Sequence, residues 1–366
     1  MIGRLDQILD DTQEPGLPEL RAVLVQTLGD SKGAILFTGA QRIWSRVYRL
    51  QFAAQAGTHT LVVKRLGPLE ARRGEQVAWN WLPAVGLADG GPGLLAVAAS
   101  ARGDWVWHVY EDLGESALAG RESDTAAVAA AVRLIASIHS RFASHPLLAE
   151  CRACGVFDIS WFAGNVRDAI RGLEDIRPPA VSITVDQAAL RGRLLARLRR
   201  LQAEQPKRAR ALADWGGPET LLHGDLWTSN TFVMRAPGGI QARLIDWDRA
   251  GVGPMSYDLS TFLLRFPAER RNWILDLYSR SLEGDAWQLP GISRLNQLFE
   301  TAEFARYANC VVWPALAITR ENAAWGWKSL AEVDRWFTAM QPVIPGERVS
   351  HLRPVRQPAN ASRGHV

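Results

Sequence analysis

Cysteine is scarce in this chain of 366 residues, which contains only Cys151, Cys154 and Cys310. Three cysteines are too few for the disulfide framework that holds many small secreted domains together. Cys151 and Cys154 form a C-x-x-C pair, but no second pair follows at the spacing of a zinc finger. We therefore assign the cysteines no metal-binding or redox role.

Long hydrophobic runs are also absent. No uninterrupted apolar stretch reaches about 18 residues, the length that spans a membrane, and no charged-then-apolar signal begins the sequence. Hydrophobic residues still make up 47% of the chain, which is enough to bury a sizeable core in two or three structural units. The sequence therefore predicts a globular, cytoplasmic protein with no membrane partner.

Blocks of one charge sign are missing as well. The formal net charge of +4 comes mostly from scattered arginines rather than from a lysine-rich block. Nucleic-acid binding normally requires basic residues clustered on one face, so we expect no nucleic-acid partner. The basic balance also suits an anionic ligand such as a nucleotide phosphate. Composition leaves both a monomer and a homodimer open.

The first third of the sequence alternates between helical and strand patterns. Apolar positions at helical spacing predict a short helix within residues 1–30. Three segments rich in β-branched and aromatic residues follow within residues 34–66, and two more lie within 94–114. A helical pattern at residues 69–82 separates the two groups of strands. These patterns predict a small antiparallel sheet accompanied by one helix.

The remaining sequence is mainly helical. Helical periodicity begins near residue 124, is interrupted by a strand-like stretch at 231–248, and resumes from 258 to about 340. The last residues are rich in proline, arginine and small polar residues and show no periodicity, which predicts a mobile tail. The fold class is therefore α+β.

The stretch LLHGDLWTSN, residues 221–230, places His223, Asp225 and Asn230 at H-x-D-x-x-x-x-N spacing. This spacing suits a catalytic loop, in which one residue accepts a substrate proton and another, a few residues on, supplies an oxygen ligand to a metal. Asp225 and Asn230 fit these two tasks. In the stretch LIDWD, residues 244–248, an apolar strand then delivers Asp246 at its end, and this carboxylate could hold Mg²⁺ against nucleotide phosphates.

With these motifs the chain resembles the aminoglycoside phosphotransferase and choline kinase family, over about residues 30–335. Members of that family are small-molecule kinases with the two-lobed protein-kinase fold. The resemblance implies transfer of the γ-phosphate of ATP or GTP, with Mg²⁺, to a hydroxyl group of a small molecule. An aminoglycoside or other antibiotic, an amino sugar and an amino alcohol are all candidate acceptors, so antibiotic resistance and a metabolic role both stay open.

The resemblance implies roles for five residues of the second lobe. Asp225 is expected to be the catalytic base, and His223 is expected to support its loop by hydrogen bonding. Asn230 and Asp246 are expected to ligate Mg²⁺. Asp258, in GPMSYDLS, matches a buried aspartate that ties the catalytic loop to the start of a helix. Considered alone, Asp258 also suits the N-cap of that helix.

In the first lobe, Lys64 at the end of LVVK matches the strand lysine that binds the α- and β-phosphates. Glu75 is expected to be its ion-pair partner, with Glu70 as the competing candidate. VYEDLG resembles the hinge between the lobes, where backbone groups of Glu111 and Leu113 would bind the adenine edge. The implied organisation is an N-terminal helical segment, an N-lobe, a hinge, a helical C-lobe and a mobile tail, with boundaries at 1–30, 31–110, 111–114, 115–340 and 341–366.

Three features depart from the protein-kinase pattern. The segment 37–50, where the phosphate-covering loop should lie, has one glycine rather than three, so Ser45 and backbone amides are expected to cover the phosphates. The short interval between Asp246 and Asp258 contains no A-P-E sequence, which excludes a protein-kinase activation segment. The sequence IDWD also allows Asp248 to contribute a second metal contact.

Acceptor specificity is expected in the helical second half. Glu300 and Glu303 fall on one helix face and Glu321 lies nearby, so the three could form an acidic cleft for a polyamine or a quaternary amine. An ordinary solvated helix surface explains the same residues. The alternative function is a nucleotide-binding pseudokinase that acts as an interaction module.

Overall fold

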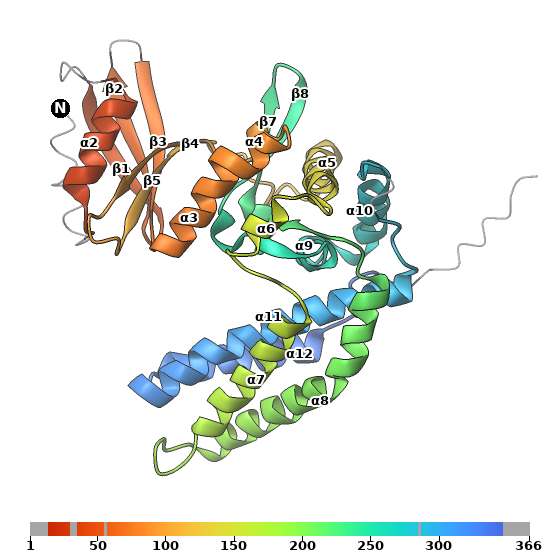
Figure 1. Ribbon diagram of the computed structural model, residues 1–366. Coiled ribbons are helices and arrows are strands. Elements are labelled where there is room, and N and C mark those ends of the chain that lie inside the picture. Colours follow the sequence, from red (N-terminus) through yellow and green to blue (C-terminus); the bar gives the residue numbers. More distant parts are fainter. Residues whose placement is uncertain (1–13, 30–34, 55–56, 285–286, 347–366) are drawn as a thin grey trace, which may run out of the picture.

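The structure, a computed structural model, has two lobes. It describes residues 14–29, 35–54, 57–284 and 287–346. Figure 1 shows a sheet-containing N-lobe on the left, followed by a larger, mainly helical C-lobe. The α+β fold class expected from the sequence is confirmed.

Five antiparallel strands form the N-lobe sheet, in the order β1-β2-β3-β5-β4. The strands are β1 (Leu36–Trp44), β2 (Val47–Ala54), β3 (Gly57–Leu66), β4 (Leu94–Ala99) and β5 (Val106–Glu111). Ser45 and Arg46 form the turn between β1 and β2, and Arg46 adopts a positive φ of 63°. The predicted order of three strands, one helix and two strands is confirmed.

One face of the sheet packs against a helix, because successive side chains of a strand point to opposite faces. Val63 and Val109 are buried on one face against Leu20 and Leu24 of helix α2 (Leu17–Thr27). Fully burying a leucine side chain stabilises a fold by about 1.5–3 kcal/mol. The helix predicted within residues 1–30 therefore packs as part of the N-lobe, and residues 1–13 and 30 of that segment lie outside the described residues.

Helix α3 (Pro68–Gln76) lies between the sheet and the C-lobe (Figure 1). It continues through a π-helical turn, Val77–Trp81, into the short helix α4 (Leu82–Ala84). From α3, Arg73 donates hydrogen bonds to the carbonyl oxygens of Cys154 at 2.9 Å and of Asp248 at 2.7 Å. These bonds attach the N-lobe helix directly to the C-lobe.

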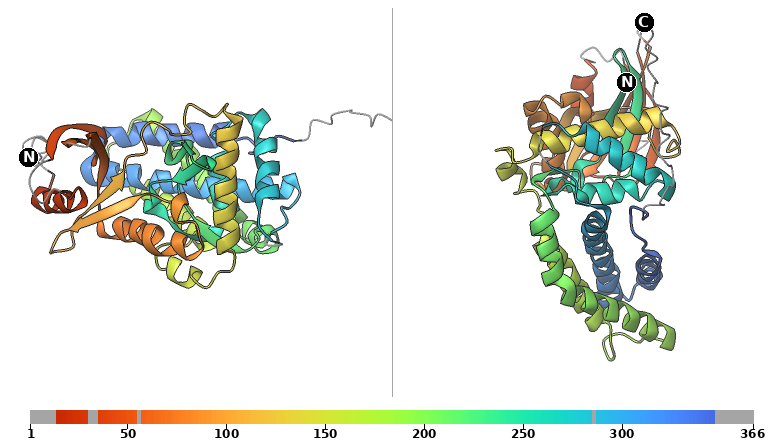
Figure 2. Two further views of the ribbon diagram at one scale, coloured as in Figure 1. Left: turned by 90° about the horizontal axis from the view of Figure 1, so that it is seen from above. Right: turned by 90° about the vertical axis from the view of Figure 1, so that its right-hand side faces the viewer.

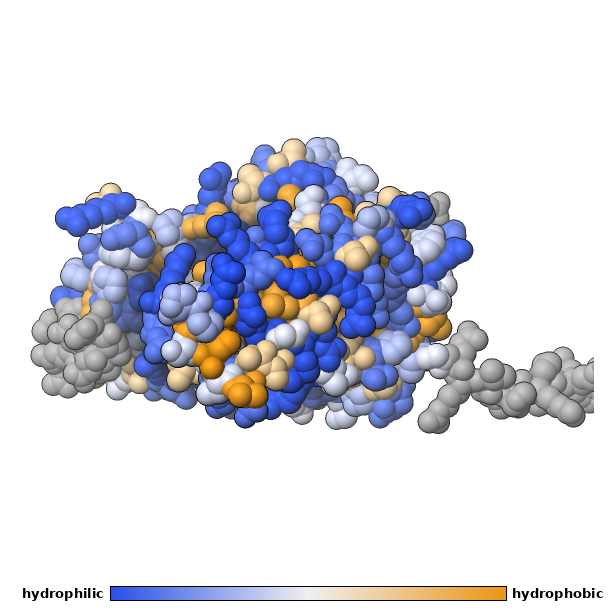
Figure 3. Space-filling model, turned by 90° about the horizontal axis from the view of Figure 1, so that it is seen from below, coloured by the Kyte–Doolittle hydropathy of each residue, from blue (hydrophilic) through white to orange (hydrophobic). Residues whose placement is uncertain are grey.

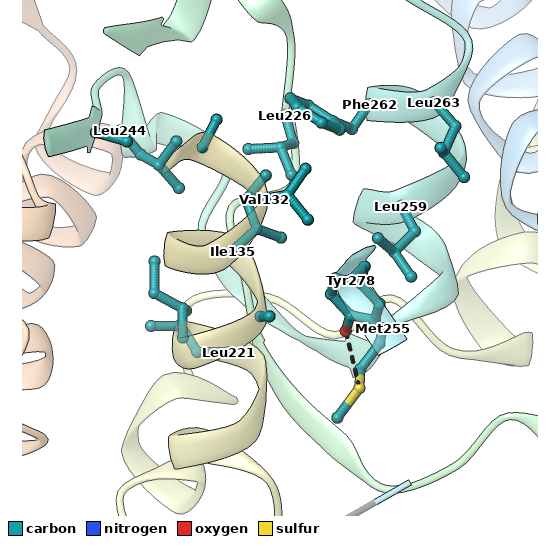
Figure 4. Close-up of a cluster of buried hydrophobic side chains, with 14 of the residues drawn as sticks. Val132, Ile135, Leu221, Leu226, Leu244, Met255, Leu259, Phe262, Leu263 and Tyr278 are labelled. Carbon is teal, nitrogen blue, oxygen red and sulfur yellow. Dashed lines mark hydrogen bonds between the residues drawn. The ribbon is translucent and has the colours of Figure 1, made fainter. Parts of the chain in front are cut away.

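One hydrophobic core fills the part of the C-lobe nearest the N-lobe. Its helices are α5 (Thr125–Phe142), α9 (Ser256–Leu263) and α10 (Ala268–Ser281), and its short strand pairs are β6 (Glu219–Leu222) with β9 (Gly251–Pro254) and β7 (Thr231–Ala236) with β8 (Gly239–Leu244). Figure 4 shows Val132 and Ile135 of α5 in this core, together with Leu259 of α9. The core supports the segments that carry the predicted catalytic residues.

A second core lies in four helices that project from the body of the C-lobe (Figure 2, right). We call them the helical arm: α7 (Ile159–Asp175), α8 (Val185–Trp215), α11 (Ile292–Glu321) and α12 (Ala324–Ala339). The arm has its own buried residues, such as Leu194, Leu198 and Val311. The C-lobe therefore combines a catalytic body with a separately packed helical arm.

Hydrophilic residues cover most of the molecular face seen in Figure 3, with hydrophobic residues in smaller patches between them. Among the described residues, no helix is long and apolar enough to cross a membrane. The three cysteines are free thiols, and burial raises the pKa of Cys151 to about 12. Val343 and Ile344 are buried, so the start of the tail predicted from residue 341 is packed. The rest of that tail, 347–366, lies outside the described residues.

Candidate active site

The predicted catalytic loop is anchored by a buried carboxylate. Strand β6 ends at Leu222, and the next two backbone N–H groups donate to Asp258: His223 to Oδ2 at 2.7 Å and Gly224 to Oδ1 at 3.0 Å. Asp258 is 1% exposed. Burial alone would raise its pKa, but hydrogen bonds and charge from His139 and His223 hold the pKa below its ordinary value. The N-cap of α9 is Met255, so the N-cap interpretation of Asp258 is wrong.

Gly224 is required by the path of this loop. Its φ is +82°, in the left-handed region that favours glycine, and an added Cβ would lie 2.2 Å from the carbonyl oxygen of Arg249. Any side chain would therefore collide with the backbone that follows Asp246. The catalytic loop and the predicted metal-binding segment touch at this point.

The His223 ring connects the same two segments. Its Nε2 lies 2.8 Å from the Ile245 carbonyl oxygen, and its Nδ1 lies 3.3 Å from the backbone N–H of Asp225. A carbonyl only accepts, so Nε2 carries the proton and Nδ1 accepts. The ring also packs on Trp247, with ring centroids 4.7 Å apart. This geometry suits the expected support of the loop rather than proton transfer.

Two polar contacts orient Asp225 itself. Asn230 donates its side-chain N–H to the Asp225 carbonyl oxygen at 3.0 Å, and this leaves the Asn230 Oδ1 as an acceptor. Trp227 donates its indole N–H to Oδ1 of Asp225 at 2.6 Å. The structure thus brings Asp225 and Asn230 together, and within the described residues Oδ2 of Asp225 is left to accept a further hydrogen bond.

Lys64 crosses from the N-lobe to two aspartates of the C-lobe. Its Nζ lies 2.6 Å from Asp246 Oδ1 and 2.6 Å from Asp248 Oδ2. Burial alone would lower the pKa of Lys64, but the two carboxylates raise it. Burial, followed by the charge of Asp246, raises the pKa of Asp248 to about 6. One ammonium faces two carboxylates, so negative charge is in excess here.

The expected contact between Lys64 and Glu75 is not among the ion pairs of the described residues. Glu75 Oε1 instead lies 3.1 Å from Nε2 of His108, whose Nδ1 lies 2.7 Å from the Tyr110 hydroxyl. His108 is directly opposite Lys64 in the β3/β5 register, so its ring takes the position beside Glu75. Glu70 lies at the start of α3, with its carboxylate beside Gly67.

The predicted hinge is fixed by side chains on both lobes. Arg243 of β8 donates to Glu111 at 2.5 Å, and Arg49 of β2 pairs with Asp112 at 2.9 Å. The N–H of Glu111 already donates to a carbonyl within the N-lobe. Within the described residues, the backbone N–H and C=O of Leu113 form no hydrogen bond, so both can serve a ligand. Ser45 is exposed at the tip of the β1/β2 hairpin.

The oxygen atoms around Lys64 suit a hard divalent cation. Asp246 and Asp248 supply carboxylates with excess negative charge, and Asn230 of the catalytic loop has an amide oxygen with no hydrogen bond among the described residues. Mg²⁺ prefers such ligands and usually completes its coordination with water and substrate phosphates. No group of three or more His, Cys, Asp or Glu in the described part of the chain is arranged to hold a metal alone. The residues present therefore fit Mg²⁺ that arrives with a nucleotide.

A pocket of about 490 Å³ opens beside Asp225, between the catalytic body and the helical arm. Of the three glutamates proposed for an acidic cleft, Glu303 lines this pocket, but it is 3% exposed and paired with Arg306. Glu300 lies in a different cavity, where it pairs with Arg208 at 3.2 Å. Glu321 is exposed at the end of α11. The structure does not bring the three glutamates together.

Several residues around the site were not predicted from the sequence. The β3/β5 register places His108 opposite Lys64 on one face of the sheet, and alternation in WVWHVY alone does not fix that register. Trp227 lies within the catalytic stretch itself. No local pattern marks the residues that line the pocket from α7, α9, α11 and α12, among them Trp161, Arg265 and Arg306.

The chain also matches a model of a known protein family. A model of the phosphotransferase enzyme family matches residues 40–292. The match includes Lys64 and the whole stretch from His223 to Asp258. No curated protein matches the chain in sequence.

Solved structures show the same fold. Ethanolamine kinase from Plasmodium vivax is 11% identical, with 89% of each chain covered and a TM-score of 0.55. The GDP and kanamycin complex of APH(2")-IIia is 12% identical, with 87% of this chain and 98% of that chain covered and a TM-score of 0.56. A microcompartment-associated aminopropanol kinase is 17% identical, with 86% and 97% covered and a TM-score of 0.50. At these identities the likeness concerns the fold.

Proposed function

The chain belongs to the phosphotransferase enzyme family, and we propose that it transfers the γ-phosphoryl group of ATP or GTP to a hydroxyl group of a small molecule, with Mg²⁺. The observation that carries this proposal is the shared support of the catalytic and metal-binding segments by His223 and Asp258. This support holds Asp225, Asn230 and Asp246 in one site, beside a pocket for an acceptor.

Asp225 acts as the general base in this proposal. Its Oδ1 accepts the indole N–H of Trp227, so its Oδ2 is available to accept a hydrogen bond from the acceptor hydroxyl. That contact orients the hydroxyl oxygen toward the phosphorus and takes up its proton during transfer. General-base assistance contributes about 10²- to 10⁴-fold in rate, and orientation of the reactants contributes further.

Asn230 and Asp246 would hold Mg²⁺, with Asp248 as a further oxygen donor. Bound Mg²⁺ neutralises charge on the nucleotide phosphates. Lys64 supplies a second positive charge from β3, and its position between Asp246 and Asp248 keeps the ammonium at the phosphate end of the site. The free backbone groups of Leu113 serve the base of the nucleotide.

The structural neighbours support a small-molecule acceptor without naming it. Their names include kinases of ethanolamine and aminopropanol and a phosphotransferase solved with kanamycin. An amino alcohol, an amino sugar and an antibiotic therefore all belong in the first set of acceptors to be tested. GDP in one neighbour supports testing GTP beside ATP.

The test is a coupled assay of ADP and GDP release with Mg²⁺, against aminoglycosides, other antibiotics, choline, ethanolamine, amino sugars and neutral or acidic alcohols. We expect release that depends on one class of acceptor. Asp225→Asn should lower kcat by about 10²- to 10⁴-fold while nucleotide affinity stays unchanged, because the variant keeps the shape of the side chain and removes only its basicity.

The matched control is Asp276→Asn, which removes an exposed carboxylate paired with Arg280 on α10. It should leave kcat unchanged. Nucleotide binding without release from any acceptor would contradict the proposal and would support the alternative, a pseudokinase that acts as an interaction module.

A further inference from the structure

The pocket beside Asp225 lacks the excess of negative charge that a polycationic acceptor requires. Its lining contains three carboxylates and three guanidinium groups. Arg306 and Glu303 form a salt bridge and cancel one another. Of the remaining acids, Asp225 is the proposed base and Glu332 is exposed on α12. Glu332 is therefore the single acid of the described lining that is left to bind an ammonium group, and a polycation needs several.

Arg265 is the less exposed of two guanidinium groups in this lining that have no ion-pair partner among the described residues, the other being the exposed Arg249. Arg265 follows the C-terminus of α9 and is partly buried, and within the described residues it has no carboxylate within ion-pair distance. Its Nε is buried without a hydrogen-bond partner. Burial lowers the pKa of Arg265, although nearby acids oppose the shift. Holding a partly buried guanidinium without a carboxylate partner costs free energy, which an anionic ligand would offset.

The Arg265 guanidinium is held in one orientation. Its central carbon lies 4.0 Å from the ring centroid of Trp227, the residue whose indole N–H donates to Asp225. Arg265 is therefore fixed one side chain away from the proposed base. A planar guanidinium fixed on an aromatic ring is well suited to bind a carboxylate or phosphate through two hydrogen bonds.

Aromatic rings supply much of the remaining pocket wall, beside polar residues such as Thr261 and Asn309. Trp161 and Tyr257 meet edge to face with centroids 5.3 Å apart, and Tyr307 contacts Trp336 at 5.8 Å. Trp227 is 41% exposed. Such walls bind flat, apolar groups through burial and stacking. They offer little to the many hydroxyl and ammonium groups of a polyamine sugar.

We propose that the acceptor is a hydroxyl compound with a flat, apolar body and one anionic group, a carboxylate or a phosphate, which Arg265 binds. This inference rests on the proposed function, since it names the acceptor of the same site. Arg265 selects the acceptor by charge, the aromatic rings bind its body, and Asp225 receives its hydroxyl group. Arg265 is a specificity-determining residue rather than part of the phosphoryl-transfer machinery.

The test uses three compounds of nearly equal shape: 4-(hydroxymethyl)benzoate, its neutral amide, and 4-(hydroxymethyl)benzylamine. Calorimetric titrations without nucleotide measure their affinities, so the result does not depend on turnover. We expect the carboxylate to bind most tightly and the amine least. Arg265→Gln should weaken binding of the carboxylate by about ten- to hundredfold and leave the amide nearly unchanged, whereas Arg265→Lys should keep part of the preference.

The matched control is Arg294→Gln on α11. Arg294 is exposed and stacks on Trp215, with its guanidinium carbon 4.7 Å from the ring centroid, but it lies outside the pocket. This variant should keep the wild-type order of affinities. Loss of this order of affinities in both Arg265→Gln and Arg294→Gln would indicate a general structural effect and would overturn the proposal.

Other outcomes separate this inference from the proposed function. Tightest binding of the amine, or no binding of the carboxylate, would overturn the inference while leaving phosphoryl transfer to a cationic acceptor intact. Arg265→Gln could instead lower kcat equally for every acceptor and leave the affinities unchanged. That result would place Arg265 on the transferred phosphoryl group and would also overturn the inference. The expected order of affinities without transfer to any alcohol would instead contradict the proposed function alone.

Discussion

The two sides of the candidate active site differ in how they balance charge. On the nucleotide side, Lys64 pairs with Asp246 and Asp248 at 2.6 Å each, and Glu75 contacts His108. On the acceptor side, Arg306 is paired with Glu303, but Arg265 has no carboxylate partner among the described residues. The nucleotide side is therefore largely organised by the protein, whereas the acceptor side leaves one strong interaction to its ligand.

This difference indicates where specificity lies. Charged and polar groups that already contact one another within the protein favour one fixed geometry, which suits a reaction that depends on positioning. A charge without an internal partner discriminates strongly between ligands, because a wrong ligand leaves it desolvated and unpaired. On the proposed function, the nucleotide side would serve many reactions of one type, and the acceptor side would select among substrates.

The largest effect should come from Asp258, which supports both sides through the catalytic loop. Asp258→Ala leaves the N–H groups of His223 and Gly224 without an acceptor, and each orphaned donor costs about 1–3 kcal/mol. We expect the free energy of unfolding, measured by guanidinium denaturation, to fall by about 4 kcal/mol. Activity per folded molecule should also fall, because the loop positions Asp225.

Asp168→Ala on α7 is the control, since its carboxylate is 55% exposed and contacts only the adjacent Arg167. It should change stability by no more than about 0.5 kcal/mol. A similar small change in Asp258→Ala would show that the loop is held by its other contacts, and the two sides would then lack a common anchor.

The nucleotide side can be tested separately by pH. Burial lowers the pKa of His108 to about 4, and the charge of Lys64 adds to this shift. The unfolded histidine titrates near 6.5, so between these values the unfolded state binds more protons. Stability from neutral His108 is therefore present above pH 6.5 and is lost as pH falls toward 4, by roughly 3 kcal/mol in total.

Urea denaturation across this pH range checks the prediction. His108→Gln removes the titrating group and should flatten the loss of stability, whereas His59→Gln, at an exposed position, should retain the wild-type slope. An unchanged slope in His108→Gln would assign the acid sensitivity to other groups. Acceptor affinity at neutral pH should be unaffected in both variants.

The smallest effect is expected on the acceptor side. Trp227→Phe removes the N–H that donates to Asp225 but keeps an aromatic ring beneath Arg265. We expect kcat to fall about tenfold, as for loss of one hydrogen bond to a charged group at a partly exposed site. Steady-state kinetics at saturating nucleotide measure this change in kcat. The acceptor affinity should stay within about twofold of the wild-type value.

Trp79→Phe is the matched control, because its indole N–H donates to the carbonyl oxygen of Leu94 in the N-lobe. It should leave kcat unchanged. A loss of acceptor affinity without a fall in kcat in Trp227→Phe would mean that the indole N–H serves acceptor binding and does not orient Asp225.

The fold and the catalytic loop could be predicted because their signals are local in the sequence. Alternation in LVVK and WVWHVY defined strands, and the spacing of His223, Asp225 and Asn230 defined a loop. Family membership follows from these same residues, and the match over residues 40–292 confirms it. The assigned roles of the individual residues stay predictions until the variants above are measured.

The contacts that could not be predicted depend on tertiary packing. The partner of Glu75 is set by the register that places His108 opposite Lys64, and no local pattern fixes that register. Glu300 and Glu303 lie three residues apart on α11, yet one pairs with Arg208 and the other with Arg306. Spacing along a helix predicts a shared face, but neighbouring helices decide what each side chain meets.

The separate core of the helical arm has an evolutionary consequence. Arm helices supply much of the pocket wall, whereas the catalytic loop is anchored to α9 and to the segment after β8 in the other core. Substitutions at sites that share no contacts combine nearly additively. Mutation can therefore reshape the pocket while the catalytic machinery stays under its own constraints, so descendants of one ancestral enzyme can acquire new substrates without inventing new chemistry.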